Sequence, residues 1–499
     1  MVKIKCNILF LSLFLFSFSP PNIELGSEQT MQLYRQCLVN ADKSLINKIA
    51  STDFRAGVYQ QPISKDMFVS FLRLMQMPDS LYWGDLQQAG DESFRMVHYV
   101  FADKKTSSRV YFAPDGKLLF SDWIDQQGLG LSRKKASSYV ASVPFEYEGG
   151  KIIITAKLND SDKPLRMLFD TGADGMALTK SLQEVCGVQI TNEQSANVPG
   201  GQVQVSKSDN NTLVLDSLSI PRQSLVLFEH IAKGIDGIIG GANLFRNYIT
   251  AMDFENKQIN LYSLGDFNAP DGYHASNMAY AGGVPTVPFH IYKDEHHFES
   301  EFIFDTGAGY SAILFGSGMK RLESDSISKF VTPQYYSYNQ SLGGRTKISI
   351  GQTDSIAFAG ISFSNANLAM EPYSEKNHAR HHVLGSIGIK SLSRFDWIVD
   401  LVSYQIYTKE NSFSELPMDF VFQGWLLGYE GNNLKVLLPV SQERMESLQV
   451  GDEILSFGKC NPSAMTADKL NKELQKKKIN LQIKKQTGVI KLTVEGESE

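Results

Sequence analysis

The stretch MLFDTGADG, from Met167 to Gly175, places an aspartate directly after an apolar run and follows it with Thr-Gly. A single Asp-Thr-Gly is an ordinary turn, because Asp starts turns and Gly tolerates unusual backbone angles. The chain carries a second copy in FIFDTGAGY, Phe302 to Tyr310. Average composition gives only roughly 0.1 copies of this tripeptide in a chain of this length. The shared Phe-Asp-Thr-Gly-Ala setting therefore indicates one structural unit that is used twice.

The sequence after each motif supports this duplication. Both copies are followed by a hairpin pattern with a Gly pair at its tip, then by short strands, an apolar-apolar-Gly element, a short helical stretch and an aromatic-rich strand. We therefore predict a mainly β fold with two duplicated lobes, residues 137–267 and 268–412. The tip glycines are candidates for flaps over a cleft: Gly200, Gly201, Gly343 and Gly344.

Two such lobes allow a specific chemistry. A carboxylate on a tight turn behind a buried strand is held rigidly, and one copy per lobe brings Asp170 and Asp305 together by pseudo-twofold symmetry. Two carboxylates about 3 Å apart cannot both ionise, so they share one proton. One then activates water as a general base while the other polarises a scissile carbonyl. Candidates for supporting the two catalytic loops are Thr171, Gly172, Thr306 and Gly307.

Residues 137–410 resemble the aspartic peptidases of the pepsin and retroviral-protease superfamily, in the two-lobe form found in bacteria. The matching motifs are the two Phe-Asp-Thr-Gly-Ala stretches and the elements Ile238-Ile239-Gly240 and Val383-Leu384-Gly385, which in that family pack beneath the catalytic loop. The resemblance implies cleavage of protein or peptide substrates without a metal or cofactor, and without a dimer, since both lobes lie in one chain.

The chain departs from the retroviral pattern at one point. Retroviral members place Arg directly after the apolar-apolar-Gly element, whereas Gly241 and Ser386 stand there in this chain. Asp174 therefore lacks its expected partner.

The segment 415–497 resembles a PDZ domain. LQVGDEILSFGK, Leu448 to Lys459, matches the core of such domains, and a helix and two strands are predicted after it. The resemblance implies a loop that binds peptide C-termini by strand addition. Its candidate residues are Gly424, Trp425 and Leu426. The alternative is a small β domain that packs on the lobes for stability.

The N-terminal part of the chain predicts export. Lys3 and Lys5 precede the apolar run ILFLSLFLFSF, which is short for a membrane span and typical of a secretory signal. Residues 1–21 are therefore read as a signal peptide or an uncleaved anchor. An extracytoplasmic location follows, whether periplasmic, secreted or membrane-tethered. Residues 27–136 predict a small α+β domain of unknown role, with two helices on an antiparallel sheet.

Composition excludes other classes of function. The net charge of -6 gives no reason to expect nucleic acid as a partner. The cysteines are scattered and have no CxxC or His-Cys spacing, so the sequence predicts no metal site. Two hypotheses remain: an exported aspartic endopeptidase, or a non-catalytic peptide-binding adaptor that retains the cleft. Two intact Asp-Thr-Gly motifs favour the enzyme, because an adaptor has little reason to keep two mutually repelling carboxylates.

Overall fold

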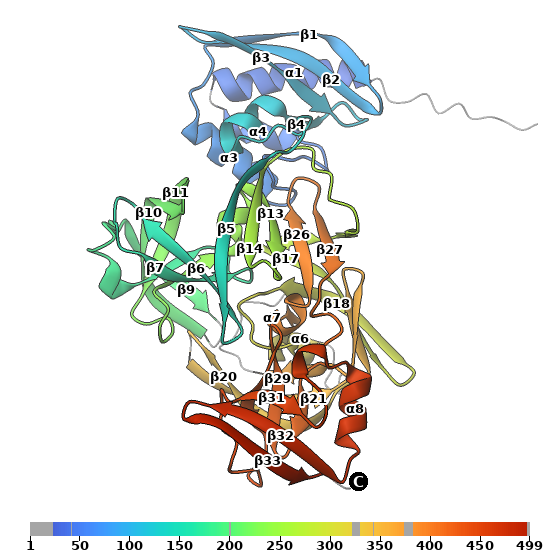
Figure 1. Cartoon of the computed structure of the whole chain (residues 1–499). Helices are drawn as coiled ribbons and strands as arrows, with labels where there is room; N and C mark the ends of the chain where they lie inside the picture. Colours follow the sequence, from blue (N-terminus) through green and yellow to red (C-terminus); the bar gives the residue numbers. More distant parts are fainter. Residues whose placement is uncertain are drawn as a thin grey trace, which may run out of the picture. The chain divides into compact units, whose positions relative to one another are not determined.

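The computed structural model describes residues 23–40, 42–198, 201–321, 330–342, 344–373 and 383–496 (Figure 1). The chain divides into two compact units, with the boundary between Arg133 and Lys134. The predicted signal segment 1–21 lies outside the described residues. Among the residues that the structure describes, no helix is long and apolar enough to cross a membrane.

The N-terminal unit is the small α+β fold expected from its sequence. Its antiparallel sheet has the strand order β1-β2-β3-β4, and helices α1 and α4 pack against the sheet. The buried hydroxyl of Tyr34 on the first helix is 2.9 Å from Ser121 Oγ and 3.3 Å from the Tyr99 hydroxyl, which ties helix to sheet. The elements are α1 (Ile23–Val39), η1 (Lys43–Leu45), α2 (Ile46–Ile49), α3 (Ser64–Leu74), β1 (Ser80–Ala89), β2 (Glu92–Val100), β3 (Lys105–Phe112), β4 (Leu118–Ser121) and α4 (Asp122–Leu129).

The first lobe of the second unit is built from antiparallel hairpins and two parallel pairs, β7 with β12 and β8 with β11. Its hydrophobic residues alternate with polar ones in strands such as β6, whose inward side chains are buried. The elements are β5 (Tyr139–Glu148), β6 (Lys151–Leu158), β7 (Leu165–Asp170), β8 (Met176–Thr179), η2 (Lys180–Leu182), β9 (Asn192–Val198), β10 (Gly201–Leu215), β11 (Leu218–Phe228), β12 (Gly237–Gly240), α5 (Gly241–Phe245), β13 (Tyr248–Asp253) and β14 (Gln258–Ser263).

The second lobe repeats this order of elements. They are β15 (His274–Asn277), β16 (Ala279–Ala281), β17 (Val284–Lys293), β18 (His296–Phe304), β19 (Ala312–Leu314), α6 (Gly316–Arg321), β20 (Thr332–Ser341), β21 (Gly344–Gln352), β22 (Ser355–Phe358), β23 (Ile361–Ser364), β24 (Asn367–Met370), β25 (Gly385–Ile387), α7 (Ile389–Leu392), β26 (Phe395–Asp400) and β27 (Gln405–Glu410). The mainly β fold with duplicated lobes is thus as predicted.

The strand that precedes each Asp-Thr-Gly has the same neighbours in both lobes. β7 pairs in parallel with β12, and β18 pairs in parallel with β25. The strand after each motif, β8 or β19, pairs antiparallel with that same partner. Each Asp-Thr-Gly turn is therefore held on two sides by hydrogen-bonded strands.

The register corrects one sequence assignment. Gly240 pairs with Asp170, and in the second lobe Ile387 pairs with Phe304 and accepts a hydrogen bond from the Asp305 N–H. The counterpart of Gly240 is therefore Gly388, three residues beyond the Gly385 expected from the sequence pattern.

The two lobes are joined by a shared sheet. β13 of the first lobe and β26 of the second pair antiparallel, with Met252 opposite Trp397, which makes one continuous 13-stranded sheet. Trp397 is fully buried and meets the Phe304 ring edge-on at 5.1 Å between centroids. Because Phe304 directly precedes Asp305, the joining sheet also supports the second Asp-Thr-Gly turn.

The C-terminal segment forms a separate six-stranded sheet with one helix, seen in red in Figure 1. We call it the C-terminal module. Its elements are β28 (Phe420–Phe422), β29 (Trp425–Glu430), β30 (Asn433–Pro439), β31 (Glu453–Phe457), η4 (Pro462–Ala464), α8 (Ala467–Leu474), β32 (Lys478–Lys485) and β33 (Gly488–Glu495).

Lobe two and the C-terminal module share a core. Leu426 is 3% exposed and belongs to one apolar cluster with lobe-two residues, against which Leu437, Leu438 and Val440 of the module also pack. The segment that connects lobe two to the module is attached to lobe two. The buried guanidinium of Arg394, which follows α7, donates to the carbonyls of Leu416 and Pro417 in this segment. The module is therefore part of the same packed body as the second lobe.

Truncating Leu426 tests this shared core. We expect Leu426→Ala to lower the free energy of unfolding by about 2–5 kcal/mol, because it removes a buried side chain and leaves a cavity. Val421→Ala is the matched control: Val421 lies opposite Leu426 in the same hairpin but is 38% exposed. Urea denaturation checks both variants, and equal effects would contradict a core shared with the lobe.

Candidate active site

Each Asp-Thr-Gly turn holds its own carboxylate with backbone N–H groups. The Gly172 N–H donates to Asp170 Oδ1 at 2.9 Å. In the second lobe, the N–H groups of Gly307 and Ala308 donate to Asp305 Oδ1 at 3.0 and 3.1 Å. Asp305 is 4% exposed, whereas Asp170 is half-buried. Both carboxylates are thus fixed by their own loops before any contact with the other lobe.

The two turns are joined by the threonines that follow the aspartates. The Thr171 N–H donates to Thr306 Oγ1 at 3.0 Å, and the Thr306 N–H donates to Thr171 Oγ1 at 2.9 Å. Each hydroxyl then donates across the interface, Thr171 to the Phe304 carbonyl at 2.5 Å and Thr306 to the Phe169 carbonyl at 2.9 Å. Both side chains are buried. This reciprocal network fixes the two aspartates in one register.

The glycines of the turns let the lobes approach closely. A Cβ placed on Gly172 would lie 2.4 Å from Cγ of Asp305, and a Cβ on Gly307 would lie 2.4 Å from Cγ of Asp170. No side chain fits in either place, so each carboxyl group packs directly on the backbone of the opposite turn. The structure therefore brings the four predicted loop residues and both aspartates together.

Glycines also lie beneath each turn. A Cβ on Gly240 would lie 2.6 Å from the Ala173 carbonyl oxygen, and one on Gly388 would lie 2.6 Å from the Ala308 carbonyl oxygen. The symmetry of these contacts supports the register correction. It also shows why the sequence needs a Gly under both loops.

A cavity of about 510 Å³ opens beside Asp170. Strand β9 and both predicted flap hairpins border it, through Val198 of the first and Leu342 of the second. Most of its remaining wall is apolar, and that wall includes Met176, Ala177, Leu225, Val226, Phe228, Ile238, Val284 and Ile303. Its size and apolar lining suit a binding pocket for side chains of a ligand.

Both hairpins form, and their strand pairing extends close to the Gly-containing tips. Gly201 pairs with Val198, and Gly344 pairs with Ser341. The other tip glycines, Gly200 and Gly343, lie outside the described residues.

Equivalent strand positions next to the two turns have different surroundings in the two lobes. Ala177 pairs with Ile238 in lobe one, and Ile313 pairs with Ser386 at the same place in lobe two. In lobe one these apolar residues line the cavity. In lobe two Ile313 lies in the cluster that contains Leu426 of the C-terminal module. Most of the apolar lining of the cavity therefore comes from lobe one, and lobe two contributes Val284, Ile303 and Leu342.

Asp174 lies beside an arginine that the sequence pattern did not indicate. A Cβ on Gly283 would lie 2.5 Å from the Asp174 Cβ and 3.0 Å from a terminal nitrogen of Arg246. Arg246 follows α5, five residues after Gly241, the position where the retroviral pattern places Arg. An arginine five residues later in the chain thus lies against the same glycine as Asp174.

The candidate peptide-binding residues of the C-terminal module take part in its own folding. Gln423 and Gly424, both with positive φ (51° and 73°), form the turn between β28 and β29. The Gly424 carbonyl accepts the Val440 N–H at 2.9 Å, and Trp425 Nε1 donates to the Met445 carbonyl at 2.9 Å. Together with the burial of Leu426, these contacts favour the packing role over capture of a peptide C-terminus at this loop.

Comparison with known proteins gives a partial match. The family model described as aspartyl protease matches residues 154–242, which include Asp170 and the first hairpin. A crystal structure of an aspartic proteinase from Irpex lacteus is similar, with a TM-score of 0.39 and 13% sequence identity, over 55% of this chain and 98% of that chain. No curated protein sequence matches this chain. The family match supports an aspartic peptidase.

The close approach of the turns is testable with alanine. We expect Gly172→Ala to destabilise the protein by about 1–3 kcal/mol or more, because the new methyl group overlaps the Asp305 carboxyl group. Gly175→Ala, in the same loop, has no atom within 4 Å of its Cβ and should be tolerated. Thermal unfolding compares the two. Equal stability would mean that the turns do not meet as described.

The threonine network is testable with an isosteric change. Thr306→Val removes the acceptor of the Thr171 N–H inside the protein, and a buried group left unpaired costs about 1–3 kcal/mol. Thr306→Ser keeps the hydroxyl and should retain most of the stability that valine loses. Urea denaturation measures both, and a valine variant as stable as the serine variant would argue against the network.

Proposed function

We propose that this protein is an aspartic endopeptidase whose catalytic groups are Asp170 and Asp305. The observation that carries the proposal is the packing of each carboxyl group on the opposite lobe's glycine, next to the cavity. The aspartates share one proton; one carboxylate removes a proton from water, and the protonated partner polarises the scissile carbonyl. Apart from the water molecule that is consumed, the proposed reaction needs only groups that the chain itself provides.

The cavity suggests how a substrate binds. An extended peptide would lie between Asp170 and the β9–β10 hairpin, whose outer strand β9 ends the 13-stranded sheet and offers a free edge for strand addition. The lobe-one wall is apolar, so we propose a preference for an apolar side chain next to the cleaved bond. Since the matching part of lobe two is covered by the C-terminal module, selectivity should come mainly from lobe one.

The remaining proposals rest on the sequence. Export out of the cytoplasm rests on residues 1–21 alone, and the substrates are proposed to be proteins or peptides. A role for the C-terminal module in substrate selection would need a peptide site other than Gly424 to Leu426, because those residues are engaged in the hairpin and the shared core.

The competing function is a peptide-binding adaptor that retains the cleft without cutting. Nothing in the geometry favours it, since both aspartates and both threonines are in place. Unfolded casein incubated with and without pepstatin separates the two functions, because only the enzyme gives inhibitor-sensitive fragments.

The aspartates should be required jointly. We expect Asp170→Asn or Asp305→Asn alone to abolish hydrolysis while the protein stays folded, because groups that act as a unit lose nearly everything singly. Asp162→Asn is the matched control, since its carboxylate is fully exposed on the same lobe as Asp170. Peptide cleavage and thermal melting are measured on all three. Either dyad variant keeping more than about a tenth of kcat would contradict the mechanism.

A further inference from the structure

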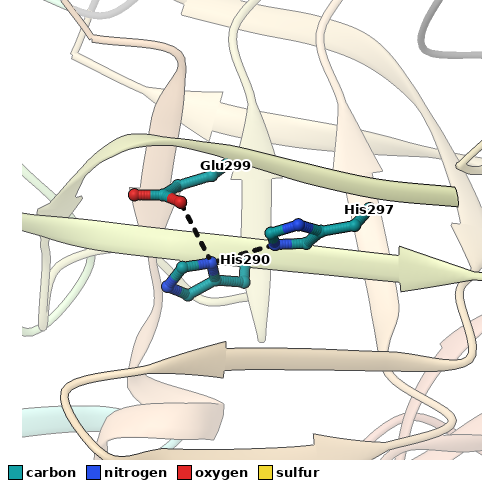
Figure 2. Close-up of side chains that lie close together, drawn as sticks. All are labelled: His290, His297 and Glu299. Carbon is teal, nitrogen blue, oxygen red and sulfur yellow. Dashed lines mark hydrogen bonds and ion pairs between the residues drawn. The ribbon is translucent and has the colours of Figure 1, made fainter. Parts of the chain in front are cut away.

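Two histidines and a glutamate gather on the β17–β18 hairpin of the second lobe. His290 lies on β17, directly opposite Glu299 on β18, and His297 lies diagonally across from His290 on the same face (Figure 2). The opposite face of β17 is buried through Phe289 and Ile291, so the three side chains lie on the outer face of the sheet. The cluster does not border the cavity at Asp170.

The distances within the cluster match those of a metal site. His290 Nδ1 is 3.1 Å from His297 Nε2 and 3.6 Å from Glu299 Oε2, and one ligand atom from each residue lies within 4.8 Å of the others. Zn²⁺ binds imidazole nitrogen at about 2.0–2.1 Å, so two ligand atoms of a tetrahedral site are about 3.3–3.4 Å apart. The two observed distances lie on either side of that value.

The surroundings are compatible with a bound ion. The Tyr292 ring stacks on His297 at 4.6 Å and 10°, which fixes the orientation of that imidazole. Lys293, the nearest cation on the hairpin, reaches the Gln352 carbonyl and follows Tyr292, on the other face. The Glu299 side chain is 56% exposed, so an ion and a fourth, water ligand both have access.

We propose that His290, His297 and Glu299 bind a divalent zinc ion, with water as the fourth ligand. Two imidazoles and one carboxylate suit Zn²⁺, whereas Mg²⁺ and Ca²⁺ prefer oxygen ligands throughout. The ion ties β17 to β18, and β18 ends at Phe304, immediately before Asp305. Its role is to stabilise the hairpin that carries the second catalytic turn, and not to take part in the cleavage itself.

Zinc titration of the full chain, freed of metal with a chelator, tests the proposal. Isothermal calorimetry should give one Zn²⁺ per chain. His297→Gln and Glu299→Gln should each weaken binding at least about tenfold, because even residues around the ligands cost that much in affinity when they are changed. Zinc should raise the melting temperature of the wild type and leave that of His297→Gln unchanged. These readouts do not depend on peptidase activity.

His296→Gln is the matched control, because His296 is the neighbour of His297 in β18 and its ring meets Phe330 instead. It should bind zinc like the wild type. Co²⁺ in place of zinc should give the visible absorption of a tetrahedral site, and His290→Gln should lose it. Absence of zinc binding by the wild type would overturn the proposal. So would equal affinity in the wild type, His297→Gln and Glu299→Gln, since the ion would then lie elsewhere.

Discussion

The reciprocal hydrogen bonds between Thr171 and Thr306 are the constraint on which the site depends. Each lobe can hold its own aspartate with backbone N–H groups, but only a contact between the lobes can place two carboxylates side by side. Because each threonine both accepts from the other's backbone and donates to a carbonyl across the interface, neither turn can shift without breaking bonds in both lobes. Two ionised carboxylates this close would repel each other, and the buried network holds the two turns together against such repulsion.

A second attachment lies at the joining sheet. The β13–β26 pairing fixes the lobes far along the chain from the turns, and Trp397 on β26 contacts Phe304 directly before Asp305. The threonine bonds and the joining sheet thus both restrict movement of one lobe relative to the other. This explains why the glycines at 172 and 307 are needed: with the lobes held in two places, the turns cannot move apart to make room for a side chain.

The sequence was sufficient for the parts of the fold that local patterns determine. The duplicated motif, the alternating strands and the hairpins with Gly tips follow from the order of residues. The register of β25 could not be predicted, because Val383-Leu384-Gly385 and Ser386-Ile387-Gly388 have similar spacing and only strand pairing distinguishes them. Arg246 beside Asp174 was missed for the same reason: its signal lies in space, five residues away from the position that the family pattern specifies. No metal site was predicted from the sequence, because only cysteine spacing was considered; the proposed zinc ligands His290, His297 and Glu299 come together only through the pairing of β17 with β18.

The C-terminal module makes the two lobes unequal, although their strands correspond. In lobe one Ala177 and Ile238 line the cavity, whereas at the matching place in lobe two Ile313 lies in the cluster that contains Leu426 of the module. An ion pair also attaches the module to lobe two: the Lys390 ammonium and the Asp419 carboxylate form it, and both side chains are mostly buried. A buried pair contributes little net stability but is costly to break, so it opposes separation of the module from the lobe. Each lobe therefore contributes one aspartate of the proposed dyad, while most of the cavity lining comes from lobe one and the module is attached to lobe two.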